Sequence, residues 1–110
     1  MKALSLLILF LSAPLHAERL YCSVSENFES VSGVDIQVEG DQKALIARTD
    51  SFVTYVSKKK GSNFEVEMFL PELEIRTYGL GALKTSEDRV GTSIWSRERL
   101  LDVVCYLKTP

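Results

Sequence analysis

The chain has 110 residues, a formal net charge of −2 and 25% charged residues. A mildly acidic chain is a poor candidate for binding nucleic acid, because phosphate neutralisation requires lysine and arginine clustered on one face. Its one run of basic residues is Lys58–Lys60. We interpret this run as a solvated hairpin tip, with a loop that contacts lipid or an anion as the alternative. No nucleic-acid partner is therefore expected.

Residues 1–17 have the features of a signal peptide. Lys2 supplies a positive charge near the start, an apolar run broken only by serines follows, and the small Ala17 ends the segment. The run is shorter than the about 20 residues that span a bilayer, so cleavage is expected rather than anchoring. We therefore predict an exported protein, periplasmic or secreted, with a single β domain over 18–110. Those 93 residues carry 12 basic and 15 acidic side chains, a net charge of −3, and lack histidine because His16 lies in the leader.

The two cysteines, Cys22 and Cys105, lie near the two ends of the predicted mature chain. In an oxidising compartment an even number of cysteines usually forms disulfides, and here only one pairing within the chain exists. A redox pair or a zinc site fits less well, because the C-x-x-C spacing and the histidine ligands are both missing. A lipoprotein acylated at Cys22 is also disfavoured, since this residue lies past the expected cleavage point. The sequence predicts a Cys22–Cys105 disulfide that ties the ends of the domain together.

Alternation of apolar and polar residues runs through most of the mature chain and is typical of half-buried strands. In 34–38, for example, valine and isoleucine alternate with aspartate and glutamine. A helix over 93–104 is the one alternative, and it fails because Arg97 and Glu98 interrupt the apolar stripe. The pattern predicts eight strands, near residues 19–25, 33–39, 43–49, 52–58, 63–70, 72–79, 89–97 and 100–108.

A simple meander keeps the apolar residues of these strands on one face. It pairs Val38 with Leu45, and a turn at Pro71-Glu72 pairs Met68 with Ile75 and Glu67 with Arg76. If Cys22 opposes Cys105, then Leu20 meets Leu107 and Val24 meets Val103, so the first and last strands become neighbours. This closure would remove both exposed sheet edges. We therefore predict a small closed antiparallel meander β-barrel of about eight strands, with a β-sandwich as the alternative.

The predicted strands average about seven residues and carry charged outer faces. A strand that crosses a bilayer needs about 9–11 residues, so no membrane insertion is expected.

The mature sequence offers few catalytic groups. Without histidine, and with both thiols in a disulfide, the usual nucleophile–base pairs cannot form. Glu65, Glu67, Glu72 and Glu74 cluster around one predicted hairpin and could in principle hydrolyse glycosides. We interpret them as a solvated acidic face, because they alternate with core residues and lack the spacing of a calcium loop. We therefore expect no enzyme, cofactor or metal site.

A candidate binding patch follows from the predicted pairing of the termini. Tyr21 would face Tyr106 on the outer face, and a turn at Glu98-Arg99 would send Trp95 and Arg97 outward beside Val104. Trp, Tyr and Arg are enriched at binding hot spots, although aromatic pairs across strands also stabilise sheets without a partner.

Two further apolar residues lie in the longest predicted connections, 26–32 and 80–88. We expect Phe28 and Leu80 to cover the barrel ends rather than to contact a partner.

The segments around the cysteines, Leu20-Tyr21-Cys22 and Val104-Cys105, resemble those of the membrane-bound lysozyme inhibitors of Gram-negative bacteria, which are small exported β-barrels. The S-G-x-x-Y element of that family is missing, since Ser32-Gly33 is followed by Val34-Asp35-Ile36, so no inhibitory residue is carried over.

Export and the lack of catalytic groups predict a small binding module, such as an inhibitor or an envelope-associated partner of another protein. The alternatives are a carboxylate-based cell-wall hydrolase and a passive structural component of the envelope.

Overall fold

A computed structural model describes residues 18–40 and 42–108, so the predicted signal peptide at 1–17 lies outside the described residues. The described chain forms strands and turns, as the alternating pattern predicts. The strands are β1 (Glu18–Glu26), β2 (Glu29–Val38), β3 (Ala44–Arg48), β4 (Val53–Lys58), β5 (Asn63–Leu70), β6 (Ile75–Ala82), β7 (Val90–Ser96) and β8 (Arg99–Leu107).

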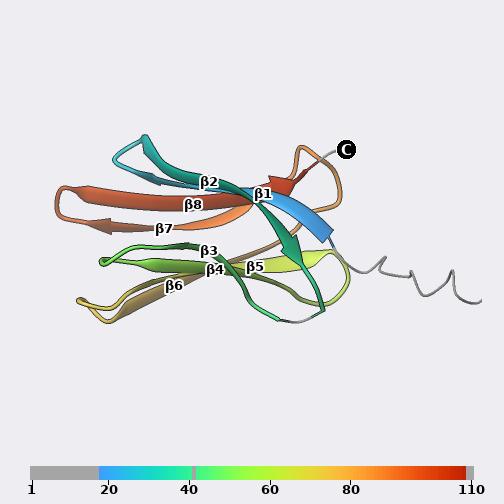
Figure 1. Cartoon of the computed structure of the whole chain (residues 1–110), viewed down its shortest axis with the longest axis horizontal. Coiled ribbons are helices and arrows are strands. Elements are labelled where there is room, and N and C mark those ends of the chain that lie inside the picture. Colours follow the sequence, from blue (N-terminus) through green and yellow to red (C-terminus); the bar gives the residue numbers. More distant parts are fainter. Residues whose placement is uncertain (1–17, 41, 109–110) are drawn as a thin grey trace, which may run out of the picture.

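The strands form two antiparallel sheets of four strands each, and Figure 1 shows the sheets as two layers. Sheet A has the order β2-β1-β8-β7, and sheet B has the order β3-β4-β5-β6. The predicted closed barrel is therefore wrong, because neither sheet closes on itself and the arrangement is that of a β-sandwich. The chain passes from sheet A to sheet B between β2 and β3, and it returns between β6 and β7.

The error has a clear physical origin. Alternation of apolar and polar residues tells which side chains face a core, but a barrel and a sandwich place those side chains on the same inner face. The expected pairing of Val38 with Leu45 therefore satisfied the pattern. In the structure Val38 pairs with Glu18 of β1, and Leu45 pairs with Tyr55 of β4.

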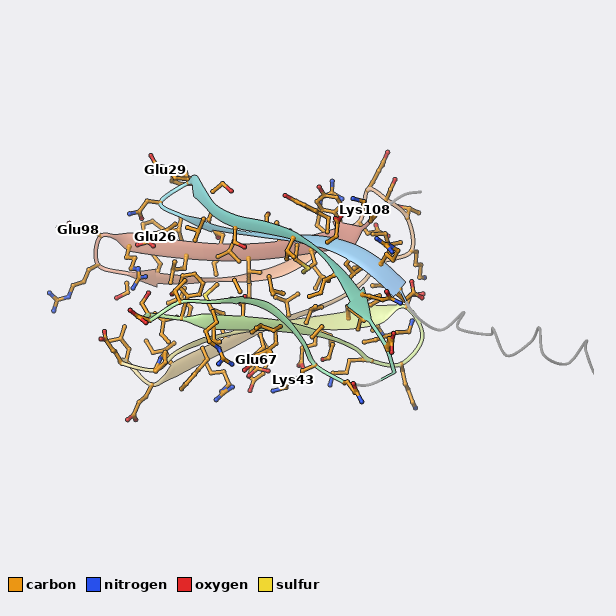
Figure 2. All side chains as sticks on the ribbon, viewed as in Figure 1. Glu26, Glu29, Lys43, Glu67, Glu98 and Lys108 are labelled. Carbon is orange, nitrogen blue, oxygen red and sulfur yellow. A yellow bond between two sulfur atoms is a disulfide. The ribbon has the colours of Figure 1, made fainter. Side chains whose placement is uncertain are left out.

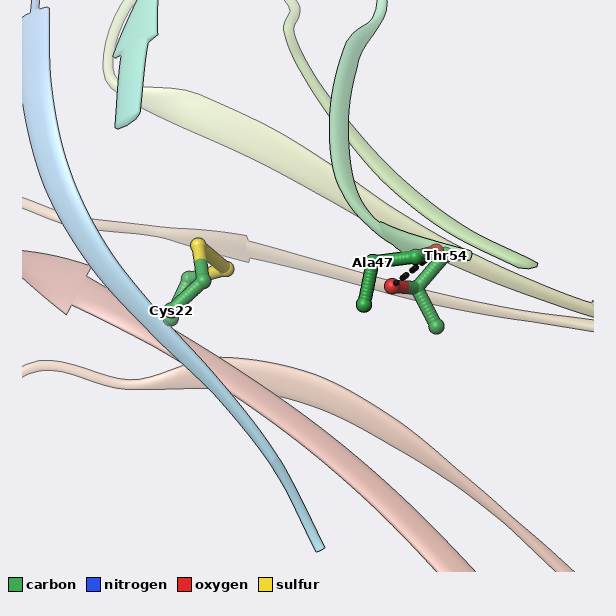
Figure 3. The surroundings of a disulfide bond; sticks show 4 residues. Cys22, Ala47 and Thr54 are labelled. Carbon is green, nitrogen blue, oxygen red and sulfur yellow. Dashed lines mark hydrogen bonds between the residues drawn. A yellow bond between two sulfur atoms is a disulfide. The ribbon is translucent and has the colours of Figure 1, made fainter. Parts of the chain in front are cut away.

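The link between the first and last strands is confirmed. Cys22 faces Cys105, Leu20 faces Leu107, and Val24 faces Val103 across β1 and β8. The two cysteines are fully buried and form a disulfide. Figure 3 shows this bond beside β1, with Ala47 and Thr54 of sheet B also drawn. The disulfide therefore joins the two central strands of sheet A.

Four connections differ from the sequence-based expectation. Strand β6 continues to Ala82, so Leu80 lies in a strand rather than in a connection over 80–88. The segment 26–32 is a tight turn at Asn27-Phe28 followed at once by β2, so it is no long loop. The turn after β5 occupies 71–74, so Leu70 pairs with Ile75.

The last hairpin turns at Arg97-Glu98 rather than one residue later, and Ser96 therefore pairs with Arg99. Trp95 still lies on the outer face. Moving the turn by one residue changes the partner of each β7 residue by two positions along β8, and side chains two positions apart point to the same face.

The core lies between the sheets, and the edge strands β6 and β7 come very close together where both carry glycine. A Cβ on Gly79 would lie 1.8 Å from the carbonyl oxygen of Gly91. Only glycine allows backbones to come this close, and the edge of one sheet thereby packs against the edge of the other. The buried apolar side chains of this core include Leu20, Val24, Val38, Phe52, Val56, Phe64, Val66, Met68, Leu101 and Val103.

Candidate binding surface

The five residues of the predicted patch lie on or beside the outer face of sheet A, but they form two separate groups. Tyr21 faces Tyr106 as predicted, and Val104 lies two residues before Tyr106. Trp95 faces Leu100, six residues away from Tyr106 along β8. At about 3.3 Å per residue the two groups are roughly 20 Å apart. They do not form one patch.

The tyrosine group is covered by the protein itself. The Tyr21 and Tyr106 rings are 5.6 Å apart, and the guanidinium of Arg89 lies 4.1 Å from the centre of the Tyr106 ring. The Tyr21 hydroxyl lies over Gly33, where a Cβ would approach it to 2.0 Å. Both rings are half-buried, so they serve as a cross-strand pair that stabilises sheet A.

The other group lies at the end of sheet A where its two hairpins turn. Phe28 and Trp95 are the two most exposed large apolar side chains among the described residues, with 85% and 77% of their surfaces accessible. They line a groove of about 300 Å³, which we call the turn-end groove. Its lining residues are Asn27, Phe28, Trp95, Arg97, Glu98 and Leu100. Phe28 therefore does not cover the core, contrary to expectation, and Leu80 is also exposed.

The backbone of the turn-end groove is held in an unfavourable conformation. Four non-glycine residues of the described chain have a positive φ, and three of them, Asn27, Phe28 and Arg97, line this groove. Phe28 has a φ of 71°, a value that asparagine tolerates and that a bulky side chain rarely adopts. Glycine is preferred at this position of a two-residue hairpin turn. Phe28 thus combines a strained backbone with an exposed ring, which makes it a candidate binding residue.

Hydrogen bonds fix the two hairpin tips to each other and to sheet B. The backbone N–H of Asn27 donates to the carbonyl oxygen of Leu100 at 2.8 Å, and the N–H of Leu100 donates to the Asn27 side chain at 2.8 Å. Arg99 donates through Nε to Glu26 at 2.8 Å and through a terminal nitrogen to Ser51 Oγ at 2.6 Å. The groove is thus built on a rigid frame rather than on a loose loop. Figure 2 shows Glu26, Glu29 and Glu98 at this end.

The outer face of sheet B carries a different arrangement, centred on Glu67. This side chain was expected in water, but only 3% of its residue surface is accessible. Lys43 Nζ lies 2.9 Å from one carboxylate oxygen, and Arg76 donates to the other. Lys43 also lies over the Tyr55 ring, and Arg76 over the Phe69 ring. The predicted solvated acidic face is therefore wrong at Glu67, because two long cationic side chains fold over it.

Two opposing effects act on the ionisation of Glu67. Burial favours the neutral acid and would raise its pKa, but hydrogen bonds from Lys43 and Arg76, together with their charges, outweigh burial and lower the pKa below its ordinary value. The hydrogen bond to Glu67 likewise raises the pKa of Lys43. Glu67 is thus held as a carboxylate, which is the wrong protonation state for a general acid near neutral pH.

Within residues 18–40 and 42–108, no group of three or more histidine, cysteine, aspartate or glutamate side chains is placed to hold a metal ion. None of the described residues belongs to a helix with the length and hydrophobicity needed to cross a bilayer.

Comparisons with protein-family models, with curated proteins and with solved structures found no match to this chain. The candidate binding surface therefore rests on its own geometry. The sequence analysis placed Trp95 on the outer face, where the structure has it, but assigned Phe28 to the wrong environment. Asn27 is a partial signal for this turn, since asparagine is favoured at the first position of a two-residue hairpin turn, but the glycine that usually follows it is replaced here by Phe28.

Proposed function

We propose that this protein is a small exported binding module that captures another protein of the cell envelope or its surroundings through the turn-end groove. The observation that carries the proposal is the pair of exposed aromatic side chains, Phe28 and Trp95, on a rigid and strained frame. Exposed apolar groups on rigid scaffolds mark interaction sites, and tryptophan beside arginine is typical of binding hot spots.

Export is part of the same proposal. It is supported by the predicted leader at 1–17 and by the Cys22–Cys105 disulfide, which is stable in an oxidising compartment. The alternative of a carboxylate-based hydrolase gains no support from the structure, because Glu67 is enclosed by two cations and Glu65 lies 3.6 Å from Lys59.

The test is affinity capture from envelope extracts of the source cells with the mature protein as bait. Trp95→Ala and Phe28→Ala should each lose the captured partner, because truncating a hot-spot residue costs about 2 kcal/mol or more. Tyr106→Ala is the matched control, since it removes an aromatic ring from the same outer face outside the groove. Melting curves must show that all three variants are folded.

Equal capture by the wild type and by the two groove variants would overturn the proposal. Loss of capture in Tyr106→Ala alone would move the binding surface to the tyrosine group.

A further inference from the structure

We infer that the partner presents a cationic side chain next to apolar ones, so that the turn-end groove takes a basic, apolar segment of another polypeptide. This inference rests on the proposed function and names the class of its partner. Three features of the groove support it: the free faces of its aromatic rings, the sign of the surrounding charge and its fixed shape.

The aromatic rings of the groove have no cation of this chain over them among the described residues. Within the described residues, four rings carry a lysine or arginine of this chain within 5.3 Å of their centres, namely Tyr55, Phe64, Phe69 and Tyr106. No such contact is found for Trp95 or Phe28 in the same part of the chain. A tryptophan face attracts a cation more strongly than other rings do. The groove therefore offers a free aromatic face to a cation of a partner, whereas at four other rings a cation of this chain occupies that position.

The charge around the groove favours the same partner. Glu26 is neutralised by Arg99, but Glu29 and Glu98 make no ion pair within the described residues. Glu98 and Arg97 line the groove and Glu29 follows Phe28 in the chain, so the two hairpin tips carry two carboxylates and one guanidinium that make no ion pair among the described residues. Complementary charge steers association and rejects partners of the wrong sign. Anionic lipid surfaces and acidic polymers are accordingly disfavoured.

The neighbouring end of sheet B adds to this acidic character. The turn at 71–74 contains Glu72 and Glu74 on either side of the exposed Leu73, and Figure 1 shows this turn at the same end of the sandwich as the turn-end groove. A partner that reaches beyond the groove would again meet carboxylates beside an apolar side chain. Carboxylates beside exposed apolar side chains thus occur at this end of both sheets.

The shape of the groove suits a side chain or a short segment rather than a flat surface. Leu100 lies opposite Trp95 across the strand pair, and the Asn27–Leu100 hydrogen bonds hold the Phe28 tip beside it. Little ordering is therefore needed on this side when a partner binds, which favours affinity.

The experiment uses Trp95, the single tryptophan of the chain, as its own reporter. The mature disulfide-bonded protein is titrated with a short peptide in which leucine and lysine alternate, and its fluorescence is followed. We expect a saturable change that weakens as salt is raised, because exposed charges are screened. Three further probes are a peptide with glutamate in place of lysine, vesicles of phosphatidylglycerol, and a neutral chitin oligosaccharide.

Variants locate the binding. Phe28→Ala should weaken binding of the leucine–lysine peptide about thirtyfold or more, as expected for a hot spot. Glu98→Gln and Glu29→Gln should each weaken it about two- to fivefold, the range of an exposed ion pair. Glu65→Gln, on the outer face of sheet B, is the matched control and should leave the binding unchanged.

The inference is overturned if the glutamate peptide binds as well as the lysine peptide, if the vesicles or the oligosaccharide bind and the lysine peptide does not, or if no probe changes the Trp95 signal. In each of these cases the proposed function still stands, provided that capture from extracts depends on Phe28 and Trp95. If capture does not depend on them, the proposed function fails and the inference fails with it.

Discussion

The two sheets of this sandwich are stabilised in opposite ways. Sheet A is locked on its inner face by the Cys22–Cys105 disulfide, and its outer face leaves Phe28 and Trp95 exposed at one end. Sheet B has no disulfide, and on its outer face Lys43 and Arg76 form ion pairs with the buried Glu67 and cover it.

This difference separates aromatic side chains that serve the fold from those available to a partner. On sheet B, Tyr55 and Phe69 each lie beneath a cation of the same chain, and so does Tyr106 on sheet A. The turn-end groove lacks such a cover and its backbone is strained, so its exposure is not explained by stability.

The largest expected effect concerns the disulfide of sheet A. Replacing both cysteines, as Cys22→Ala with Cys105→Ala, should lower the free energy of unfolding by about 4–5 kcal/mol, because the disulfide closes a loop of more than 80 residues in the unfolded chain. Urea unfolding measures the change. The wild type in reductant should match the double variant, and the double variant should not respond to reductant. A loss below about 1 kcal/mol would mean that sheet A does not depend on this bond.

The next effect concerns the ion pairs of Glu67 on the outer face of sheet B. Glu67→Gln keeps the size of the side chain but removes its charge, and it should cost about 1.5–3 kcal/mol at pH 7, the range of a hydrogen bond to a charged group. Because the folded pKa of Glu67 is lowered, its contribution is complete above the unfolded pKa of about 4.3 and is lost as the pH falls through the folded pKa.

Urea unfolding of the wild type and of Glu67→Gln from pH 7 down to pH 2 measures this dependence, and the two curves should converge at the acid end. Glu65→Gln is the matched control, since that side chain is more exposed and lies 3.6 Å from Lys59, and its effect should stay within about 0.5 kcal/mol. A difference between wild type and Glu67→Gln that is constant with pH would contradict the assignment.

The smallest effect has the opposite sign and tests the strain in sheet A. Phe28→Gly should stabilise the protein by about 0.5 kcal/mol, because glycine adopts a positive φ without the penalty that a bulky side chain incurs, and part of this gain is offset by the greater freedom of glycine in the unfolded chain. For a domain of this size the melting temperature should rise by about 2–4 °C. The same variant should lose partner capture.

Leu80→Gly provides the contrast, since Leu80 is also exposed but pairs with Glu65 within β6, where glycine weakens a strand. It should lower the melting temperature. If Phe28→Gly lowers it as well, the Phe28 ring stabilises the fold and the interpretation of strain is wrong.

Alternation along the sequence was sufficient to predict an all-β fold of eight strands. It also placed Trp95 on the outer face although the turn was misplaced by one residue, because side chains repeat with a period of two. The two cysteines allowed a single pairing, and from that pairing the contacts of Leu20 with Leu107 and Tyr21 with Tyr106 followed directly. These features depend on local periodicity or on one covalent constraint, both of which can be read from a sequence.

The tertiary structure alone decided how the strands divide between sheets and which surface groups come together. An inner face looks the same in a barrel and in a sandwich, so the sequence pattern could not show that β2 and β3 belong to different sheets. The division of the predicted patch into a covered pair and an open groove depends on how far apart residues lie along a strand. The burial of Glu67 depends on two cations brought in from other strands or connections. Such contacts between distant parts of the chain leave no periodic signal in the sequence.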